Sequence, residues 1–206
     1  ELIPVMSPYL WVAMSGADAT LASQAVTANN LANANTTGFR AEMYATRALP
    51  VVGSRLATQV YAVVEQPGAN LESGPVTRTG RPLDVAINGR GWIVVQAPDG
   101  QPALTRNGDL SISSTGVLET ITGHPVLSDN AQPITLPPMS SLQIGVDGTV
   151  SGVPQGSQPN APVTLGRIQL VNPAVKNLYR GRDGLFRSRA PLVPNAAVGL
   201  TPRALE

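Results

Sequence analysis

Apolar and small residues recur at alternating steps of four and three between Pro8 and Asn35. A 3.5-residue repeat of this kind is typical of a helix that packs against a partner along one narrow stripe. We call this stripe the seam. Gln24 and Asn35 are its polar positions, and its apolar or small positions are Leu10, Met14, Ala17, Leu21, Ala28 and Leu31. The pattern predicts one helix of about 42 Å, which is longer than a short globular domain needs.

Four asparagines crowd the last two turns of this predicted helix: Asn29, Asn30, Asn33 and Asn35. Asparagine is a weak helix former because its side chain competes for backbone hydrogen bonds. A polar side chain at a seam position lowers stability but fixes the register of the partner. We predict a left-handed helix cap at Gly38. The alternative interpretation is a frayed helix end that runs into an asparagine-rich turn.

The helical period is lost between residues 39 and 70. Pro50 precedes two valines and disfavours a continuous helix. Apolar and polar residues alternate over residues 59–64, as they do in a strand. We predict an extended connector that contains one or two strands, which could pair as a hairpin.

From residue 71 to about residue 171, short apolar runs alternate with turn dipeptides. The turns are Asn88-Gly89, Asp99-Gly100, Asn107-Gly108, Thr115-Gly116 and Asp147-Gly148. Many short strands joined by such turns predict a compact antiparallel β-sandwich or partly closed barrel. The fold class is therefore α+β and mostly β. We expect an N-terminal coiled-coil helix with its signature (1–38), the connector (39–70), a β-rich middle domain (71–189) and an extended return segment (190–206).

The composition narrows the function classes. Only 13 % of the 206 residues are charged and the formal net charge is +1, so no electrostatic feature favours nucleic acid as a partner. The sequence has no cysteine, which excludes disulfide and thiol chemistry. We expect neither a cleaved signal peptide nor a membrane span, because no apolar run is long enough for either.

Few residues offer catalytic chemistry. His124 is the only histidine, and it lies between a glycine and a proline with no nucleophile motif in the chain. One histidine with scattered aspartates makes no metal-ligand cluster. Asp84 lies within an apolar run, which predicts an ion pair or hydrogen bonds with a nearby arginine. We therefore expect no enzyme, no cofactor and no metal site.

Trp92 and a basic strip near the C-terminus offer binding chemistry. Trp92 could stack on a sugar, but in a chain with 4 % aromatic residues a core position is the favoured interpretation. The strip could contact peptidoglycan or lipid head groups, although a polar subunit contact or a solvated face is favoured. Its members are Lys176, Arg180, Arg182, Arg187 and Arg189.

Residues 28–40, ANNLANANTTGFR, resemble the N-terminal signature of the bacterial flagellar axial family of rod, hook and hook-associated proteins. The resemblance covers nearly all of the chain. Residues 47–51 and Trp92 resemble the proximal rod members most. Further sequence motifs resemble the middle domain of the family: GRPLDVAING (80–89), GWIVV (91–95), TRNGD (105–109), GHPVL (123–127), DGTV (147–150) and LVNP (170–173).

The resemblance implies a structural subunit of the basal-body rod, which assembles with itself and with other rod proteins into a helical drive shaft that transmits torque through the periplasm. It also implies passage through the flagellar type III export apparatus. The subunit interface would comprise the seam and the rest of the signature: Asn29, Asn30, Ala32, Asn33, Asn35, Thr36, Thr37, Gly38 and Phe39.

Members of the family continue into a C-terminal helix, so we expect a helix beyond Glu206 that pairs with the seam. The alternative from another class is a periplasmic β-sandwich adhesin or glycan-binding module with a helical stalk. Trp92 and the basic strip are the features that motivate it.

Overall fold

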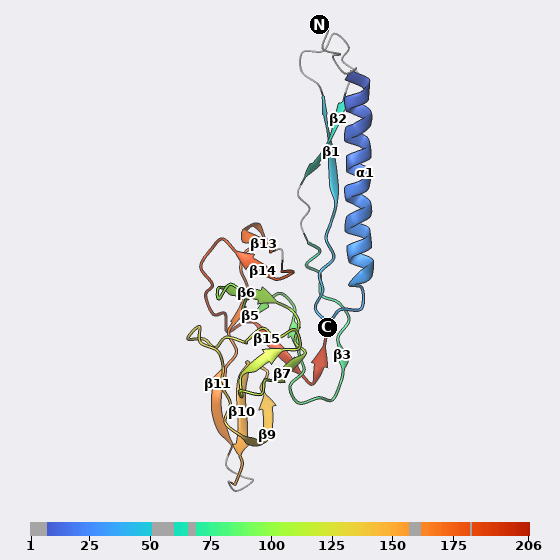
Figure 1. Ribbon diagram of the computed structural model, residues 1–206. Coiled ribbons are helices and arrows are strands. Elements are labelled where there is room, and N and C mark those ends of the chain that lie inside the picture. The colour runs from blue at the N-terminus through green and yellow to red at the C-terminus, as the bar shows by residue number, and fades with distance from the viewer. Residues whose placement is uncertain (1–7, 51–59, 66–68, 157–161, 182) are drawn as a thin grey trace. The chain divides into compact units, whose positions relative to one another are not determined.

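The computed structural model describes residues 8–50, 60–65, 69–156, 162–181 and 183–206 (Figure 1). The chain divides into two compact units. Unit 1 comprises residues 1–36 and 40–70, and unit 2 comprises residues 37–39 and 71–206.

Unit 1 is a long helix packed on a two-stranded hairpin. Helix α1 (Pro8–Ala32) begins at the predicted residue, with proline in the first turn, where its missing N–H costs nothing. Strands β1 (Ala45–Pro50) and β2 (Val60–Glu65) pair antiparallel, with Ala48 opposite Ala62. The hairpin expected within the connector is confirmed. Because β2 packs against α1, the connector supplies the helix with a packing partner inside its own unit.

Unit 2 is built from small antiparallel sheets. The largest has five strands, in the order β12 (Leu170–Val171), β5 (Trp92–Gln96), β6 (Pro102–Thr105), β14 (Phe186–Ser188) and β13 (Leu178–Arg180). A second has the order β11 (Val163–Arg167), β10 (Thr149–Pro154) and β9 (Met139–Ile144). Three strand pairs complete the unit: β15 (Gly199–Pro202) with β4 (Val85–Asn88), β16 (Ala204–Leu205) with β3 (Thr77–Arg78), and β7 (Leu110–Ile112) with β8 (Leu118–Thr120).

The predicted class of one helix with mostly antiparallel strands is confirmed, whereas the expected barrel is not. The strands of the described ranges form several small sheets and no closed barrel. A barrel needs a continuous ladder with a constant stagger. Here β10 shifts register twice, between Val150 and Ser151 and between Val153 and Pro154, and most strands are too short to carry a ladder further.

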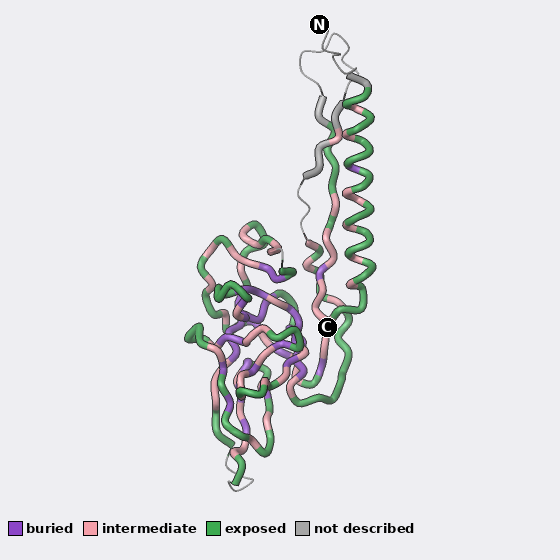
Figure 2. The backbone as a smooth tube through the Cα atoms, viewed as in Figure 1, coloured by how far each residue is buried: buried purple, intermediate pink, exposed green. Residues whose placement is uncertain are grey.

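The core of unit 2 is aliphatic and continuous. Ile87, Ile93, Leu118 and Leu200 are among its fully buried members, each of which contributes about 1.5–3 kcal/mol by leaving water. Leu200 lies opposite Ile87 in the β15–β4 pair. The end of the return segment is thus a strand of this core. In Figure 2 the buried residues concentrate in unit 2, while α1 is mostly exposed.

Candidate interaction surface

Helix α1 has two faces on roughly opposite sides of its axis. Successive residues of an α-helix are about 100° apart, so the seam positions from Leu10 to Leu31 fall within one stripe about 100° wide. Val12, Ala19 and Val26 fall on the opposite side. We call the side with the seam the outer face and the opposite side the inner face.

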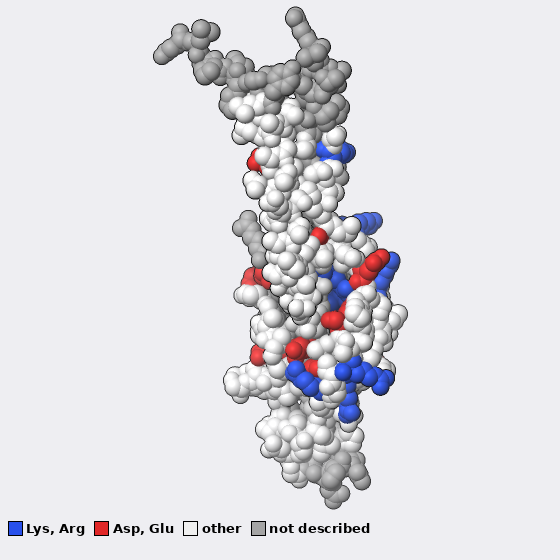
Figure 3. Space-filling model, turned by 90° about the vertical axis from the view of Figure 1, so that its right-hand side faces the viewer, with Lys and Arg blue, Asp and Glu red and all other residues white. Residues whose placement is uncertain are grey.

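The outer face carries apolar side chains in contact with solvent. Leu10 is 46 % exposed, Met14 43 %, Leu21 62 % and Leu31 77 %, and Ala17 and Ala28 are exposed between them. Asp18 is the only charged residue in the whole helix, and the side of α1 visible in Figure 3 is almost free of charge. An extended apolar stripe of this kind typically marks an interaction surface.

The inner face packs on the hairpin of unit 1. Ala19 is buried, and Val12 and Val26 are half-buried. The hydroxyl group of Tyr44 donates a hydrogen bond to the carbonyl oxygen of Ala19 at 2.5 Å. Sequence reasoning missed this face, because its members are small or widely spaced and the outer residues dominate the pattern.

Asn30 lies on the inner face rather than on the seam. Its Nδ2 donates to the carbonyl oxygen of Glu42, and the N–H of Glu42 donates to its Oδ1, each at 2.9 Å. The amide group therefore pairs with the backbone as a neighbouring strand would. Asn30 therefore fixes the position of the connector relative to helix α1 within unit 1, and not the register of a neighbouring subunit.

The other asparagines form the end of the helix. The backbone N–H and the Nδ2 of Asn33 both donate to the carbonyl oxygen of Asn29, and Thr36 N–H donates to the carbonyl oxygen of Asn33. The helix ends at Ala32, so the predicted end at Asn35 is wrong and the asparagine-rich turn is the correct interpretation. Ala32, Asn29, Asn35 and Thr36 are exposed.

The last signature residues, Thr37 to Phe39, belong to unit 2. Gly38 has the expected positive φ, +70°, but it lies six residues beyond the helix and does not cap it. A Cβ atom there would lie within 3.0 Å of the backbone of Arg106 and Asn107. The N–H of Gly38 donates to the carbonyl oxygen of Glu206 at 3.1 Å, and the guanidinium of Arg180 lies 4.9 Å from the centre of the Phe39 ring.

A buried ion pair lies behind Gly38. The Nε of Arg106 donates to Oε2 of Glu206 at 2.9 Å, and both side chains are 2 % exposed. The same guanidinium donates to the carbonyl oxygens of Gly89 and Gly91 at 3.0 and 2.9 Å. Sequence reasoning missed this pair, because its partners lie 100 residues apart and each looks like an ordinary polar residue.

Asp84 has the arginine partner that its place in an apolar run predicted. Its Oδ1 lies 3.4 Å from Nε of Arg81, and its Oδ2 accepts a hydrogen bond from the Thr79 hydroxyl group at 2.5 Å. Arg81 also contacts Asp109 at 3.0 Å. The cluster holds together the turn before β4 and the turn after β6.

Most cations of the basic strip contact groups of unit 2 itself. Both terminal nitrogens of Arg187 donate to the carboxylate of Asp183, at 2.9 and 2.8 Å, and these bonds hold the pKa of Asp183 below its ordinary value. Arg189 lies 5.7 Å from the centre of the Tyr179 ring. Arg182 lies outside the described residues. Lys176 is exposed.

Trp92 is a core residue, as favoured from the sequence. It is 4 % exposed, and its ring packs against Phe186 with 4.7 Å between centroids. Nδ1 of His124 lies 2.9 Å from the hydroxyl oxygen of Thr122. Within the described ranges, no three His, Asp or Glu side chains gather as a metal site would require. No helix in those ranges combines the length and the hydropathy of a membrane span.

Two family models match the chain. One, described as the flagellar hook protein FlgE/F/G D1 domain, matches residues 86–152, and the other, described as flagella basal body rod protein, matches residues 10–40. The chain is 46 % identical to the flagellar basal-body rod protein FlgF of Salmonella typhimurium and 44 % identical to that of Escherichia coli, in each case over 90 % of this chain and 73 % of the relative. It is 34 % identical to FlgG of Buchnera aphidicola subsp. Schizaphis graminum, over 81 % of this chain and 68 % of the relative.

Proposed function

Because this chain belongs to the family of flagellar basal-body rod proteins, we propose that it is a rod subunit whose outer α1 face packs against neighbouring subunits. The observation that carries the proposal is the exposed stripe of Leu10, Met14, Leu21 and Leu31. The inner face is occupied by the hairpin of the same unit. The outer face is the part of α1 left for another molecule.

The chemistry of the outer face suits assembly. A helix of 25 residues with a single charge gains little from solvation, so burying its apolar side chains against a neighbour is favourable. Contacts that join different surfaces of successive subunits and do not close generate a helical filament. Other rod proteins and copies of this chain would be the neighbours.

The finer parts of the proposal rest on the sequence resemblance. Residues 47–51 and Trp92 support a position in the proximal rod. Membership of such a rod would require passage through the type III export apparatus, a periplasmic location and the transmission of torque. The signature residues Thr37, Gly38 and Phe39 would contribute by fixing the start of unit 2 rather than by touching neighbours.

The glycan-binding alternative gains no support from the residues that motivated it. The Trp92 ring is buried against Phe186 and offers no free face for a sugar. Arg180 and Arg187 contact groups of unit 2. The remaining exposed cations, such as Lys176, are the groups that we propose for contact with peptidoglycan.

The proposal predicts that Leu21→Asp and Leu31→Asp block incorporation into the rod, because each places a charge in the apolar stripe. Ala25→Asp is the matched control: Ala25 is exposed and lies two turns after Asp18, on the side of the helix that already carries a charge. We expect motility and basal-body incorporation to be lost in the two leucine variants and retained in the control.

Purified variants distinguish assembly from folding. At these exposed positions, aspartate should cost only about 0.5 kcal/mol of helix propensity, and the melting of unit 2 should not change. Normal incorporation of both leucine variants, or an equal loss in the Ala25→Asp control, would refute the role of the outer face.

A further inference from the structure

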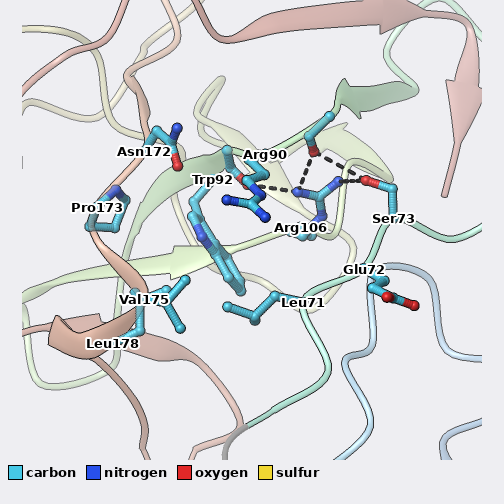
Figure 4. A pocket seen from close by; sticks show the side chains of 12 residues that line it. Leu71, Glu72, Ser73, Arg90, Trp92, Arg106, Asn172, Pro173, Val175 and Leu178 are labelled. Atoms are coloured by element: carbon cyan, nitrogen blue, oxygen red, sulfur yellow. Dashed lines mark hydrogen bonds between the residues drawn. The ribbon is translucent and has the colours of Figure 1, made fainter.

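Unit 2 has a pocket of about 350 Å³ beside the turn that joins β4 to β5 (Figure 4). Leu71, Pro173, Val175 and Leu178 form apolar walls around Trp92. The pocket lies on unit 2 alone and uses no residue of α1. Its volume suits one or two amino-acid side chains rather than a large cofactor.

The indole N–H of Trp92, a residue that lines the pocket, is a hydrogen-bond donor without a partner among the described residues. Trp92 as a whole is only 4 % exposed, but its indole nitrogen is not among the buried side-chain atoms that lack a hydrogen-bond partner, so the N–H is open to solvent. In Figure 4 the indole nitrogen is on the ring edge turned toward Asn172 and Pro173. A ligand that presents an acceptor can replace water at such a donor without losing the hydrogen bond. The structure thus leaves a place for an acceptor supplied from outside.

Arg90 adds a positive charge at the mouth of the pocket. Its side chain is exposed and, within the described ranges, takes part in no ion pair. In Figure 4 its guanidinium group lies beside Trp92, whereas the carboxylate of Glu72 points away from the ring. The deeper Arg106 is not available, because Glu206 and two carbonyl oxygens occupy its donors.

We propose that this pocket binds a peptide segment of another protein in which an aliphatic side chain stands next to a carboxylate. The aliphatic group would lie against Leu71, Val175 and Leu178. A backbone carbonyl would accept from the Trp92 indole, and the carboxylate would pair with Arg90. A glycan fits less well, because the face of the Trp92 ring is covered by Phe186.

This second contact surface goes beyond the proposed function and does not depend on the outer face of α1. The two proposals can therefore fail separately. Loss of the pocket would leave the helix seam intact, and loss of the seam would leave peptide binding by unit 2 intact.

The chain has two tryptophans, so the indole region of a ¹H–¹⁵N NMR spectrum of the full chain reports Trp92 directly, with Trp11 as an internal reference. The probe is the blocked peptide acetyl-Gly-Leu-Asp-Gly-amide, and its partner peptide has Asn in place of Asp. We expect the first to shift the Trp92 indole signal and leave that of Trp11 unchanged. The Asn peptide should bind roughly fivefold more weakly, as the loss of one partly exposed charge pair implies.

Arg90→Gln should weaken binding of the Asp peptide to the level of the Asn peptide. Arg78→Gln, which removes an exposed arginine outside the pocket, should leave it unchanged. The proposal is overturned if neither peptide shifts the Trp92 signal or if both bind equally to the unaltered chain. It is also overturned if Arg78→Gln weakens binding as much as Arg90→Gln, or if N,N′-diacetylchitobiose shifts the indole signal and the peptides do not.

Discussion

Replacing Glu206 with alanine is expected to lower the free energy of unfolding of unit 2 by about 3–5 kcal/mol. The reason is that the Arg106 guanidinium would remain buried with its charge uncompensated, since both side chains are 2 % exposed. Oε1 of Glu206 also accepts a hydrogen bond from the N–H of Gly74 at 2.6 Å. The substitution would therefore loosen the segment before β3 as well.

Urea unfolding followed by Trp92 fluorescence, in a Trp11→Phe background, measures this loss without adding salt that would screen the pair. Asp129→Ala is the matched control. Asp129 lies 3.9 Å from Arg167, and the two side chains are 38 % and 41 % exposed, so its loss should cost at most about 0.5 kcal/mol. A loss of at most about 0.5 kcal/mol in Glu206→Ala as well would show that the Arg106–Glu206 pair does not stabilise unit 2.

Gly38→Ala is expected to destabilise unit 2 by about 2–4 kcal/mol, from two sources. The left-handed backbone, with φ +70°, costs an alanine about 1 kcal/mol. The new Cβ would also lie within 3.0 Å of the backbone of Arg106 and Asn107, and backbone atoms cannot move aside as a flexible side chain can.

Gly123→Ala separates these two sources. Gly123 has φ +82°, and a Cβ atom added to it would meet no other atom within 4 Å, so its substitution should cost only about the 1 kcal/mol that the left-handed backbone imposes. The measurement is the same urea midpoint and slope. If the two variants lose equal stability, the tight approach of Gly38 to the Arg106 backbone is not what makes glycine necessary there.

The helix and its outer face could be predicted from the sequence, because periodicity reports directly which residues share a face. The repeat places Leu10, Met14 and Leu21 on one stripe, and the structure leaves that stripe exposed. The turn dipeptides likewise locate strands such as β5 and β7 closely. Local patterns predict local structure well.

The strand pairing and the buried contacts depend on residues that lie far apart in the chain, and no local sequence pattern shows which of them meet. The sequence does not show which strands pair, so it predicts a sandwich or barrel where the structure has several small sheets. The Arg106–Glu206 pair and the approach of Gly38 to Arg106 join segments far apart in the chain. The sequence predicts a role for Asn30 at a neighbouring subunit, because it does not show that Glu42 returns beside the helix.

The most direct test of the assembly surface uses the absence of cysteine from the chain. A single Leu21→Cys substitution places a thiol in the outer face, and Ser114→Cys places one in an exposed turn of unit 2 as a control for access of the reagent. Maleimide labelling is compared between the purified chain and basal bodies isolated from cells. If α1 packs against neighbouring subunits through its outer face, Leu21→Cys will react readily in the free chain and much more slowly in the basal body; equal rates in both states would contradict it.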